Sequence, residues 1–208
     1  MIEDKKPKNY NFSEVFKVFG KNYILVPLEV FKNDPYKTLV STLLSSRTRD
    51  EVTLEASKRL FKEAPNIRKL QQLNSETIQQ LIFPVGFYKT KSKHLKLLAR
   101  TVLARYSGKV PKTREELMFL PGVGRKTANL TLNRAFGIPA IAVDTHVHRI
   151  SNLLGWVHTK TPQPTEKELI KILPKNYWTD INRLFVSIGR QFYSKKKLEE
   201  FLKNNKLI

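Results

Sequence analysis

Two residues of this chain, a lysine and an aspartate eighteen positions apart, are well suited to covalent chemistry. Lys126 follows a Gly-x-Gly turn in the segment LPGVGRKTAN, and Asp144 lies in the segment VDTHVHR. A deprotonated lysine amine is a nucleophile, and a neighbouring carboxylate can accept its proton. We therefore expect Lys126 and Asp144 to act together, and Asp144 is also a good N-cap for the helical run that follows it.

The residues around Lys126 predict a helix, a tight turn and a second helix. Proline interrupts a helix, and glycine tolerates the positive φ that a tight turn demands. Good helix formers lie on both sides of the turn, at residues 114–117 and 125–136. The second helix would begin with exposed N–H groups and the positive end of its dipole, which together attract an anion. We expect a nucleic-acid phosphate to bind at this turn, at Gly122, Val123, Gly124 and Arg125.

The net charge of the chain indicates a polyanionic partner. Its 208 residues include 38 Lys and Arg against 18 Asp and Glu, a formal net charge of +20. Such an excess repels itself in a compact fold, which favours nucleic acid as the partner. A basic membrane-surface protein is the alternative, but no apolar run approaches the roughly 20 residues that span a bilayer, and no signal peptide follows Met1. We expect a cytoplasmic, DNA-associated protein that does not bind membranes.

Helical spacing of apolar residues predicts an all-α fold. The short run Ile138–Val143 follows a helix stop and leads into Asp144, so we interpret it as an extended connector rather than a strand. Residues before Tyr10 are polar and rich in lysine, and we expect them to fray. Breakers separate the helical stretches, among them Pro162 to Pro164. The clearest stripes are Leu39, Val40, Leu43 and Leu44; Val52, Ala56 and Leu60; Leu95, Leu98, Val102 and Tyr106; and Ile181, Leu184, Phe185 and Ile188.

The segments around Lys126 and Asp144 resemble those of the helix-hairpin-helix DNA glycosylases, and specifically of the endonuclease III branch. Three further segments, LLSSRTRDEVT, VGFYKTKSKHL and WTDINRLFVSIGRQ, resemble the same family in the expected order. The resemblance runs from about residue 34 to residue 191. It implies a helical barrel at 33–137 that ends in the hairpin, and a second helical lobe at 1–32 and 138–208 that carries Asp144. Lys126 and Asp144 would then face each other across a DNA-binding cleft between the lobes.

The resemblance also implies an activity, that of a base-excision-repair DNA glycosylase with AP lyase activity. In the family, the lysine at the position of Lys126 is the nucleophile of bifunctional enzymes, which nick the strand by β-elimination through a Schiff base. The expected partner is double-stranded DNA with oxidised pyrimidines of the thymine glycol type or abasic sites, bound by a monomer. Two alternatives stay open: a monofunctional glycosylase for mismatched or alkylated bases, and a non-catalytic DNA-binding module.

Three more residues are candidate DNA contacts. A glycosylase must extrude its target base and stabilise the gap. By family position, Arg47 would fill the gap and Phe87 would wedge a base step, although the family usually has glutamine where Arg47 stands. Their ordinary interpretations are a surface charge and a core aromatic. His146 is expected to contact a phosphate or to pack, since His146 and His148, two positions apart, point in different directions and do not suit a metal.

The chain contains no cysteine. A disulfide or a thiolate-ligated iron–sulfur cluster is therefore impossible, and we expect no metal and no organic cofactor. Most endonuclease III relatives carry a four-cysteine iron–sulfur cluster near the C-terminus, so this chain departs from the family there. Leu198, Phe201 and Leu202 lie at i, i+3 and i+4, which predicts a short helix that closes the second lobe by packing alone.

Overall fold

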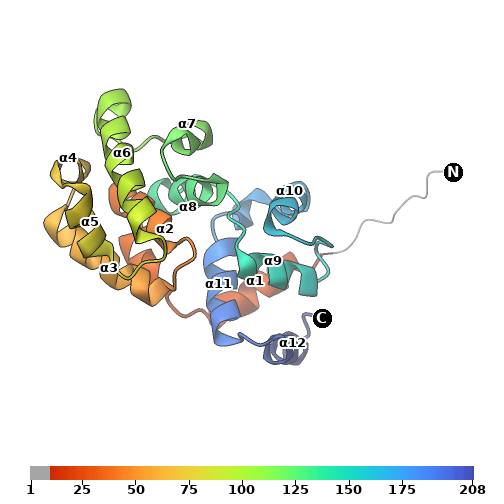
Figure 1. The fold of residues 1–208 in the computed structure, drawn as a ribbon. Helices are drawn as coiled ribbons and strands as arrows, with labels where there is room; N and C mark the ends of the chain where they lie inside the picture. Colours follow the sequence, from red (N-terminus) through yellow and green to blue (C-terminus); the bar gives the residue numbers. More distant parts are fainter. Residues whose placement is uncertain (1–9) are drawn as a thin grey trace. The chain divides into compact units, whose positions relative to one another are not determined.

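A computed structural model describes residues 10–208, and within this range the chain forms helices and contains no β-strand (Figure 1). The predicted all-α fold is confirmed. The expected fraying before Tyr10 concerns residues outside the described range. No helix in the described part of the chain is both long and apolar enough to cross a membrane.

The chain divides into two compact units. One comprises Val26–Ala142, and the other combines the N-terminal residues up to Leu25 with Val143–Ile208. The larger unit therefore includes the short 3-10 helix η1 before residue 33, because η1 contacts α2 and α3. It also includes the connector up to Ala142.

The larger unit is arranged around α2, which contacts η1, α3, α6 and α8. Eight of the eleven residues of α2 are buried, polar as well as apolar ones. The predicted stripe residues of this unit lie in its core, with Val52 and Tyr106 packed at its margin. The elements are η1 (Pro27–Phe31), α2 (Pro35–Ser45), α3 (Asp50–Glu63), α4 (Ile67–Gln72), α5 (Ser75–Ile82), α6 (Tyr88–Tyr106), α7 (Arg114–Phe119) and α8 (Arg125–Phe136).

The predicted hairpin is confirmed as α7, a turn and α8. A buried asparagine, Asn129, ties α8 to α7 and to the connector after α8. Asn129 Oδ1 accepts from Arg114 Nε of α7 at 2.7 Å, and Asn129 Nδ2 donates to the carbonyl of Ile141 at 2.8 Å. Gly137 ends α8 with a φ of 66°, a conformation that favours glycine. The next residues are extended without pairing into a strand, as expected for a connector.

The smaller unit has α11 at its centre, in contact with α1 and α9. Aromatic side chains of α1, α11 and the loop after α9 form much of its core; Phe16, for example, lies 5.9 Å from Phe185 between ring centroids. Pro162 and Pro164, predicted to be breakers, instead lie in the first turn of α10, where proline fits because its missing N–H is not needed. The elements are α1 (Phe12–Lys21), α9 (Thr145–Leu153), α10 (Pro162–Ile172), η2 (Lys175–Tyr177), α11 (Ile181–Gln191) and α12 (Lys195–Asn204).

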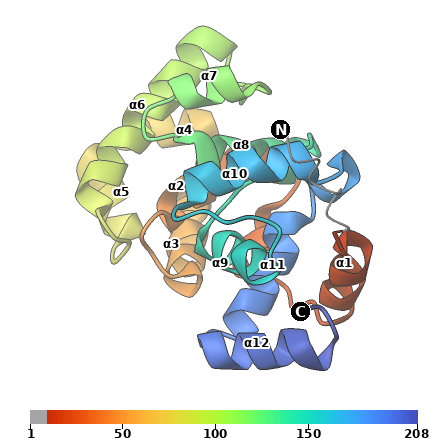
Figure 2. The same ribbon diagram turned by 90° about the vertical axis from the view of Figure 1, so that its right-hand side faces the viewer.

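The lysine-rich tail forms the predicted helix, α12, which follows closely on the end of α11 (Figure 2). Leu198 and Leu202 are fully buried. Phe201 stacks on Phe192 with ring centroids 4.3 Å apart. The carbonyl of Leu207 accepts a hydrogen bond from Asn11 at 2.9 Å, which ties the chain end to the residue before α1. The tail is thus part of the core of the smaller unit.

An arginine of α9 completes the end of α11. Arg149 donates to the carbonyls of Gly189 and Phe192, at 3.1 and 3.3 Å, and to the carbonyl of Tyr193. The last carbonyls of a helix have no partner within it and carry the negative end of its dipole. The Arg149 guanidinium therefore satisfies one of these carbonyls, that of Gly189, and anchors the start of the tail through Phe192 and Tyr193.

Burial of the tail can be tested with Leu202→Ala. Loss of a fully buried leucine leaves a cavity and should lower the free energy of unfolding by about 2–5 kcal/mol in urea denaturation. Lys203→Ala, at an exposed position of the same helix, is the matched control and should change it by less than about 0.5 kcal/mol. Equal stabilities of the two variants would show that α12 is a solvated appendage.

Candidate functional site

The hairpin turn presents its glycines outward and its valine inward. Gly122 and Gly124 are exposed, whereas Val123 is buried and anchors the turn in the core. Gly122 has a φ of 78°, and a Cβ there would lie 2.7 Å from the His94 ring, so only glycine fits. The space around Gly124 is open. The N–H of Val123 donates to the carbonyl of Leu120 at 3.1 Å, inside the turn, so the glycines are the residues best placed to meet a phosphate.

Lys126 lies in the first turn of α8, directly after Gly124 and Arg125. Its side chain is exposed, while the residues that follow it, from Thr127 to Leu132, are buried. The helix is therefore fixed by its inner face and presents Lys126 to the solvent. A nucleophile must be reachable by its substrate, and Lys126 meets this condition.

Asp144 is the N-cap of α9, as predicted. Its Oδ1 accepts hydrogen bonds from the N–H groups of His146 and Val147, both at 2.9 Å. These two bonds orient the carboxylate and use only one of its oxygens. The ring of His146 packs against Gly189 of α11 so closely that a Cβ at Gly189 would collide with it. This contact supports the packing interpretation of His146, and its predicted contact with DNA stays a prediction.

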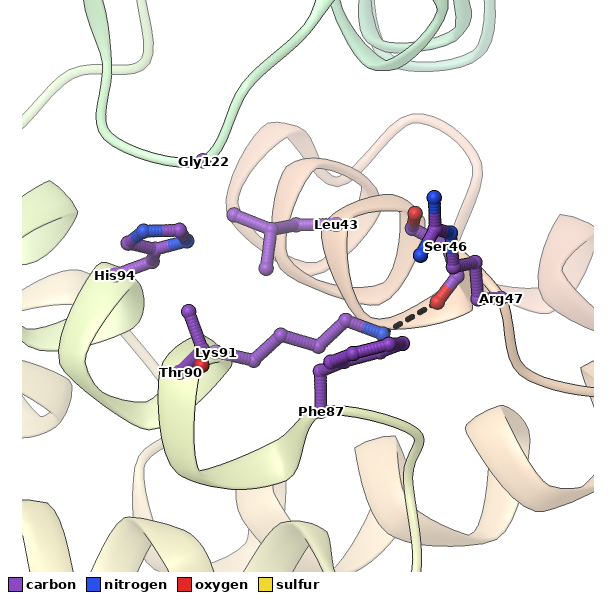
Figure 3. Close-up of a pocket in the computed structure, with 8 residues that line it drawn as sticks. All are labelled: Leu43, Ser46, Arg47, Phe87, Thr90, Lys91, His94 and Gly122. Atoms are coloured by element: carbon purple, nitrogen blue, oxygen red, sulfur yellow. Dashed lines mark hydrogen bonds between the residues drawn. The ribbon is translucent and has the colours of Figure 1, made fainter.

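A pocket with a volume of about 340 Å³ lies in the larger unit, at the end of α2, the start of α6 and the hairpin (Figure 3). It brings together three of the residues predicted from the sequence, Arg47, Phe87 and Gly122. Lys126 belongs to the same unit but does not line this pocket, and Asp144 and His146 belong to the smaller unit. The full lining is Leu43, Ser46, Arg47, Phe87, Thr90, Lys91, His94 and Gly122.

Arg47 and Phe87 form a pair at this pocket. The Arg47 guanidinium lies 5.4 Å from the centroid of the Phe87 ring. Both residues have left-handed backbone, with φ of 54° and 58°, which is uncommon for side chains of this size. Phe87 is 60% exposed, so its interpretation as an ordinary core aromatic is wrong. The pair projects an aromatic ring and a cation that are free to meet a ligand.

Lys91 is a pocket residue that the sequence analysis did not single out. It is only 6% exposed, and its ammonium donates to the carbonyls of Leu44 and Ser46 at 2.8 and 2.5 Å. Burial lowers the pKa of Lys91 to about 8. The signal that could have found it is its spacing, because Lys91 lies one helical turn before the apolar stripe of Leu95 and Leu98 on α6.

In the described range 10–208, no group of three or more His, Cys, Asp or Glu side chains gathers where it could hold a metal ion. The polar features of the site are instead helix ends, amide groups and cations. This arrangement suits binding of a phosphate backbone and chemistry by an amine.

Comparison with known proteins agrees with this arrangement. Residues 40–175 match the model of the HhH-GPD superfamily base excision DNA repair protein. Endonuclease III of Thermotoga maritima is 45% identical over 195 residues, which cover 92% of this chain and 88% of that protein. Endonuclease III-like protein 1 of Mus musculus is 43% identical over 159 residues, which cover 75% of this chain but only 53% of the mouse protein.

A solved structure of a trapped endonuclease III–DNA covalent intermediate superposes with a TM-score of 0.79 and 34% identity, over 88% of this chain and 85% of that one. The chain therefore belongs to the HhH-GPD superfamily of base excision DNA repair proteins and, within it, to the endonuclease III family.

Burial of the Lys91 ammonium predicts a pH dependence of stability. Between pH 8 and pH 10.5, the ordinary lysine value, the folded protein has released a proton that the unfolded chain still binds. Stability rises with pH wherever the unfolded state binds more protons. We expect the free energy of unfolding of the wild type to rise relative to that of Lys91→Met by roughly 1–3 kcal/mol across this window.

The measurement is urea denaturation at pH 7.5 and pH 10. Lys93→Met, at an exposed position two residues away, is the control, and its difference from the wild type should not depend on pH. If the free energies of unfolding of the wild type and Lys91→Met differ by the same amount at both pH values, the pH dependence is wrongly assigned to the Lys91 ammonium.

Proposed function

We propose that this chain is a bifunctional DNA glycosylase and AP lyase that acts as a monomer on double-stranded DNA containing oxidised pyrimidines or abasic sites. Membership of the endonuclease III family supports the glycosylase activity. The observation that carries the lyase activity is the exposed Lys126 in the first turn after the hairpin. For a relative with 34% identity, a covalent intermediate with DNA has been trapped.

In the proposed reaction, Asp144 accepts a proton from Lys126 and the free amine attacks C1′ of the flipped nucleotide. The bond from C1′ to the base breaks, and the base leaves with the electron pair and takes up a proton. The bond from C1′ to O4′ then opens as a C1′=N bond forms, and O4′ takes up one of the two protons on the attached nitrogen, giving a protonated Schiff base. This electron sink permits loss of a C2′ proton and departure of the 3′-phosphate, and water finally hydrolyses the imine.

Asp144 has a second proposed role, stabilisation of the positive charge that develops on the sugar. Fixed charges aimed at such a site contribute strongly to catalysis because they need no reorganisation during the reaction. The two backbone N–H bonds that Oδ1 accepts hold the carboxylate in place. The remaining oxygen, Oδ2, is the one we assign to this role.

DNA contacts are assigned to the hairpin and to the Arg47–Phe87 pair. The exposed backbone of Gly122 and Gly124, at the positive end of the α8 dipole, is suited to a phosphate. The exposed ring of Phe87 and the guanidinium of Arg47 are suited to unstack a base step and to fill the gap left by the flipped nucleotide. The net charge of +20 supplies binding that does not depend on base sequence.

Trapping with borohydride tests the Schiff base. Wild-type protein should become covalently attached to abasic duplex DNA when the imine is reduced. Lys126→Ala should abolish trapping yet retain DNA binding, and the exposed-lysine control Lys203→Ala should trap normally. Asp144→Asn should lower turnover by roughly 10²–10⁴-fold. A wild-type protein that cleaves abasic DNA but never traps would contradict the imine mechanism.

A panel of lesion duplexes separates the two alternatives from this proposal. A monofunctional glycosylase would release a mismatched or alkylated base without nicking the strand. A non-catalytic module would bind abasic DNA without cleaving it. The presence of both Lys126 and Asp144 argues against the two alternatives, because neither a monofunctional glycosylase nor a non-catalytic module requires an amine nucleophile. We expect oxidised pyrimidines to give base release and strand nicking together.

We also propose that activity needs no iron–sulfur cluster and no metal. The chain has no cysteine, and α12, whose start is anchored by Arg149 of α9, forms the segment after α11 where the family resemblance would place a cluster. Purified protein should be colourless, contain no iron and keep its full rate of abasic-site cleavage in the presence of a chelator. Metal analysis and a cleavage assay in EDTA provide the measurement, and loss of activity that added metal restores would refute the proposal.

A further inference from the structure

Arg47 and Phe87 come from different elements, yet each is held in the same uncommon backbone conformation. Arg47 follows α2 and Phe87 precedes α6, with φ of 54° and 58°. A left-handed conformation is unfavourable for a non-glycine residue and persists only where the surroundings determine it. Two such residues with their side chains in contact require a feature that holds both loops.

The side chain that joins α6 to the loop of Arg47 is Lys91. Its ammonium donates to the carbonyls of Leu44 and Ser46, at 2.8 and 2.5 Å, and to the hydroxyl of Thr48 at 3.4 Å. Ser46 and Thr48 are the two neighbours of Arg47 in the chain. Figure 3 shows Lys91 extending from α6 beneath Arg47, alongside the Phe87 ring, to reach Ser46. One cation from α6 therefore contacts both neighbours of Arg47, the backbone of Ser46 and the side chain of Thr48.

The hydroxyl of Thr48 carries the connection on to Phe87. It accepts a hydrogen bond from the N–H of Gly86 at 3.1 Å, and Gly86 immediately precedes Phe87. The two loops touch here, since a Cβ on Gly86 would lie 2.7 Å from the carbonyl oxygen of Arg47. Lys91, Thr48 and Gly86 thus form a continuous polar clamp between the loop of Arg47 and the loop of Phe87.

The contacts of Lys91 argue against the rival role of a second nucleophile. A buried lysine at a pocket is a familiar form of an activated amine. However, the ammonium has three protons, and three protein oxygens lie within hydrogen-bonding distance of it. With 6% of the residue exposed, C1′ of a nucleotide could not reach it without breaking the clamp. Lys126, which is exposed, does not have this obstacle.

We propose that Lys91, through Thr48, is a positioning residue that holds Arg47 and Phe87 as one preorganised pair for insertion into duplex DNA. This inference rests on the proposed function of that pair. If both side chains are already ordered, opening the duplex does not have to supply the free energy of ordering two loops. Without the clamp, the catalytic residues would be intact but the opening of a base pair would become slow.

The test compares two substrates under single-turnover conditions, a lesion in duplex DNA and an abasic site in single-stranded DNA, which needs no opening. Lys91→Met keeps the length of the side chain and removes the ammonium. It should slow the duplex reaction roughly tenfold to hundredfold and slow the single-stranded reaction no more than about threefold. A fluorescent base next to the lesion should report the slower opening directly.

Lys96→Met is the matched control. Lys96 is another α6 lysine whose ammonium donates to two backbone carbonyls, those of Gln71 and Leu73, but it holds the loop between α4 and α5. If a variant reacts more slowly only because it is less stable, the loss of rate should be similar in Lys91→Met and Lys96→Met and on both substrates. The proposal is overturned if Lys91→Met behaves like Lys96→Met, or if it slows both substrates equally.

Thr48 supplies a second test in case Lys91→Met does not fold. Thr48→Val preserves the shape and removes the hydroxyl that joins Lys91 to Gly86, so it should show the same selective loss on duplex DNA. Thr48→Ser keeps the hydroxyl and should restore the duplex rate. A serine variant as slow as the valine variant would refute the clamp.

Borohydride trapping of the wild type on single-stranded abasic DNA separates failure of this inference from failure of the proposed function. If the wild type does not trap, the imine mechanism is wrong. If it traps normally and Lys91→Met processes duplex lesions at the wild-type rate, only the positioning role is wrong. Trapping that survives Lys126→Ala but is lost in Lys91→Met would make Lys91 the nucleophile and overturn both assignments.

Discussion

Burial of α2 is the constraint on which the functional part of the larger unit depends. Four neighbouring elements pack on this helix, and eight of its eleven residues are buried. A helix that ends inside a protein leaves its last carbonyls without partners, and water cannot reach all of them. The carbonyl of Leu44 is satisfied by the ammonium of Lys91. The same packing fixes α8 against α2, and with it the direction in which Lys126 leaves the helix.

Polar groups at helix ends recur at each candidate functional position. The α8 start presents glycine backbone, the α9 start is capped by Asp144, and the α11 end is capped by Arg149. In each case the helix end carries a fixed partial charge. Asp144 and Arg149 supply the opposite charge at two of these ends, and at the start of α8 the space around Gly124 is open. Such sites are rigid because the helix itself is held by its apolar face. In the smaller unit, Arg149 and the packing of α12 hold the segment that follows α11.

Those parts of the structure that local sequence determines were predictable. The hairpin followed from Pro121, Gly122 and the helix formers around them, and the N-cap role of Asp144 followed from its place before a helical run. Pro162 was misinterpreted because the same residue that stops one helix can begin another. Lys91 was missed for a different reason. Its partners are two carbonyls and a hydroxyl, 43 to 47 residues away in the chain. One lysine among many carries no mark of burial except its helical spacing from apolar residues.

The positive φ values of Arg47 and Phe87 could not have been read from the sequence either, because neither residue type favours them. Their cost is a property of the fold: the loops are held by Lys91, by Thr48, and by Arg59, whose guanidinium donates to the carbonyls of Leu81 and Phe83. Lys91 and Arg59 donate to backbone carbonyls, and the Thr48 hydroxyl accepts from the N–H of Gly86, so the bonds that constrain the loops also satisfy backbone groups. The cost of the left-handed conformation at the exposed pair is thus offset by hydrogen bonds of the backbone around it. If the pair inserts into DNA as proposed, its side chains can stay exposed because the restraint acts on their backbone, through Lys91 and Thr48.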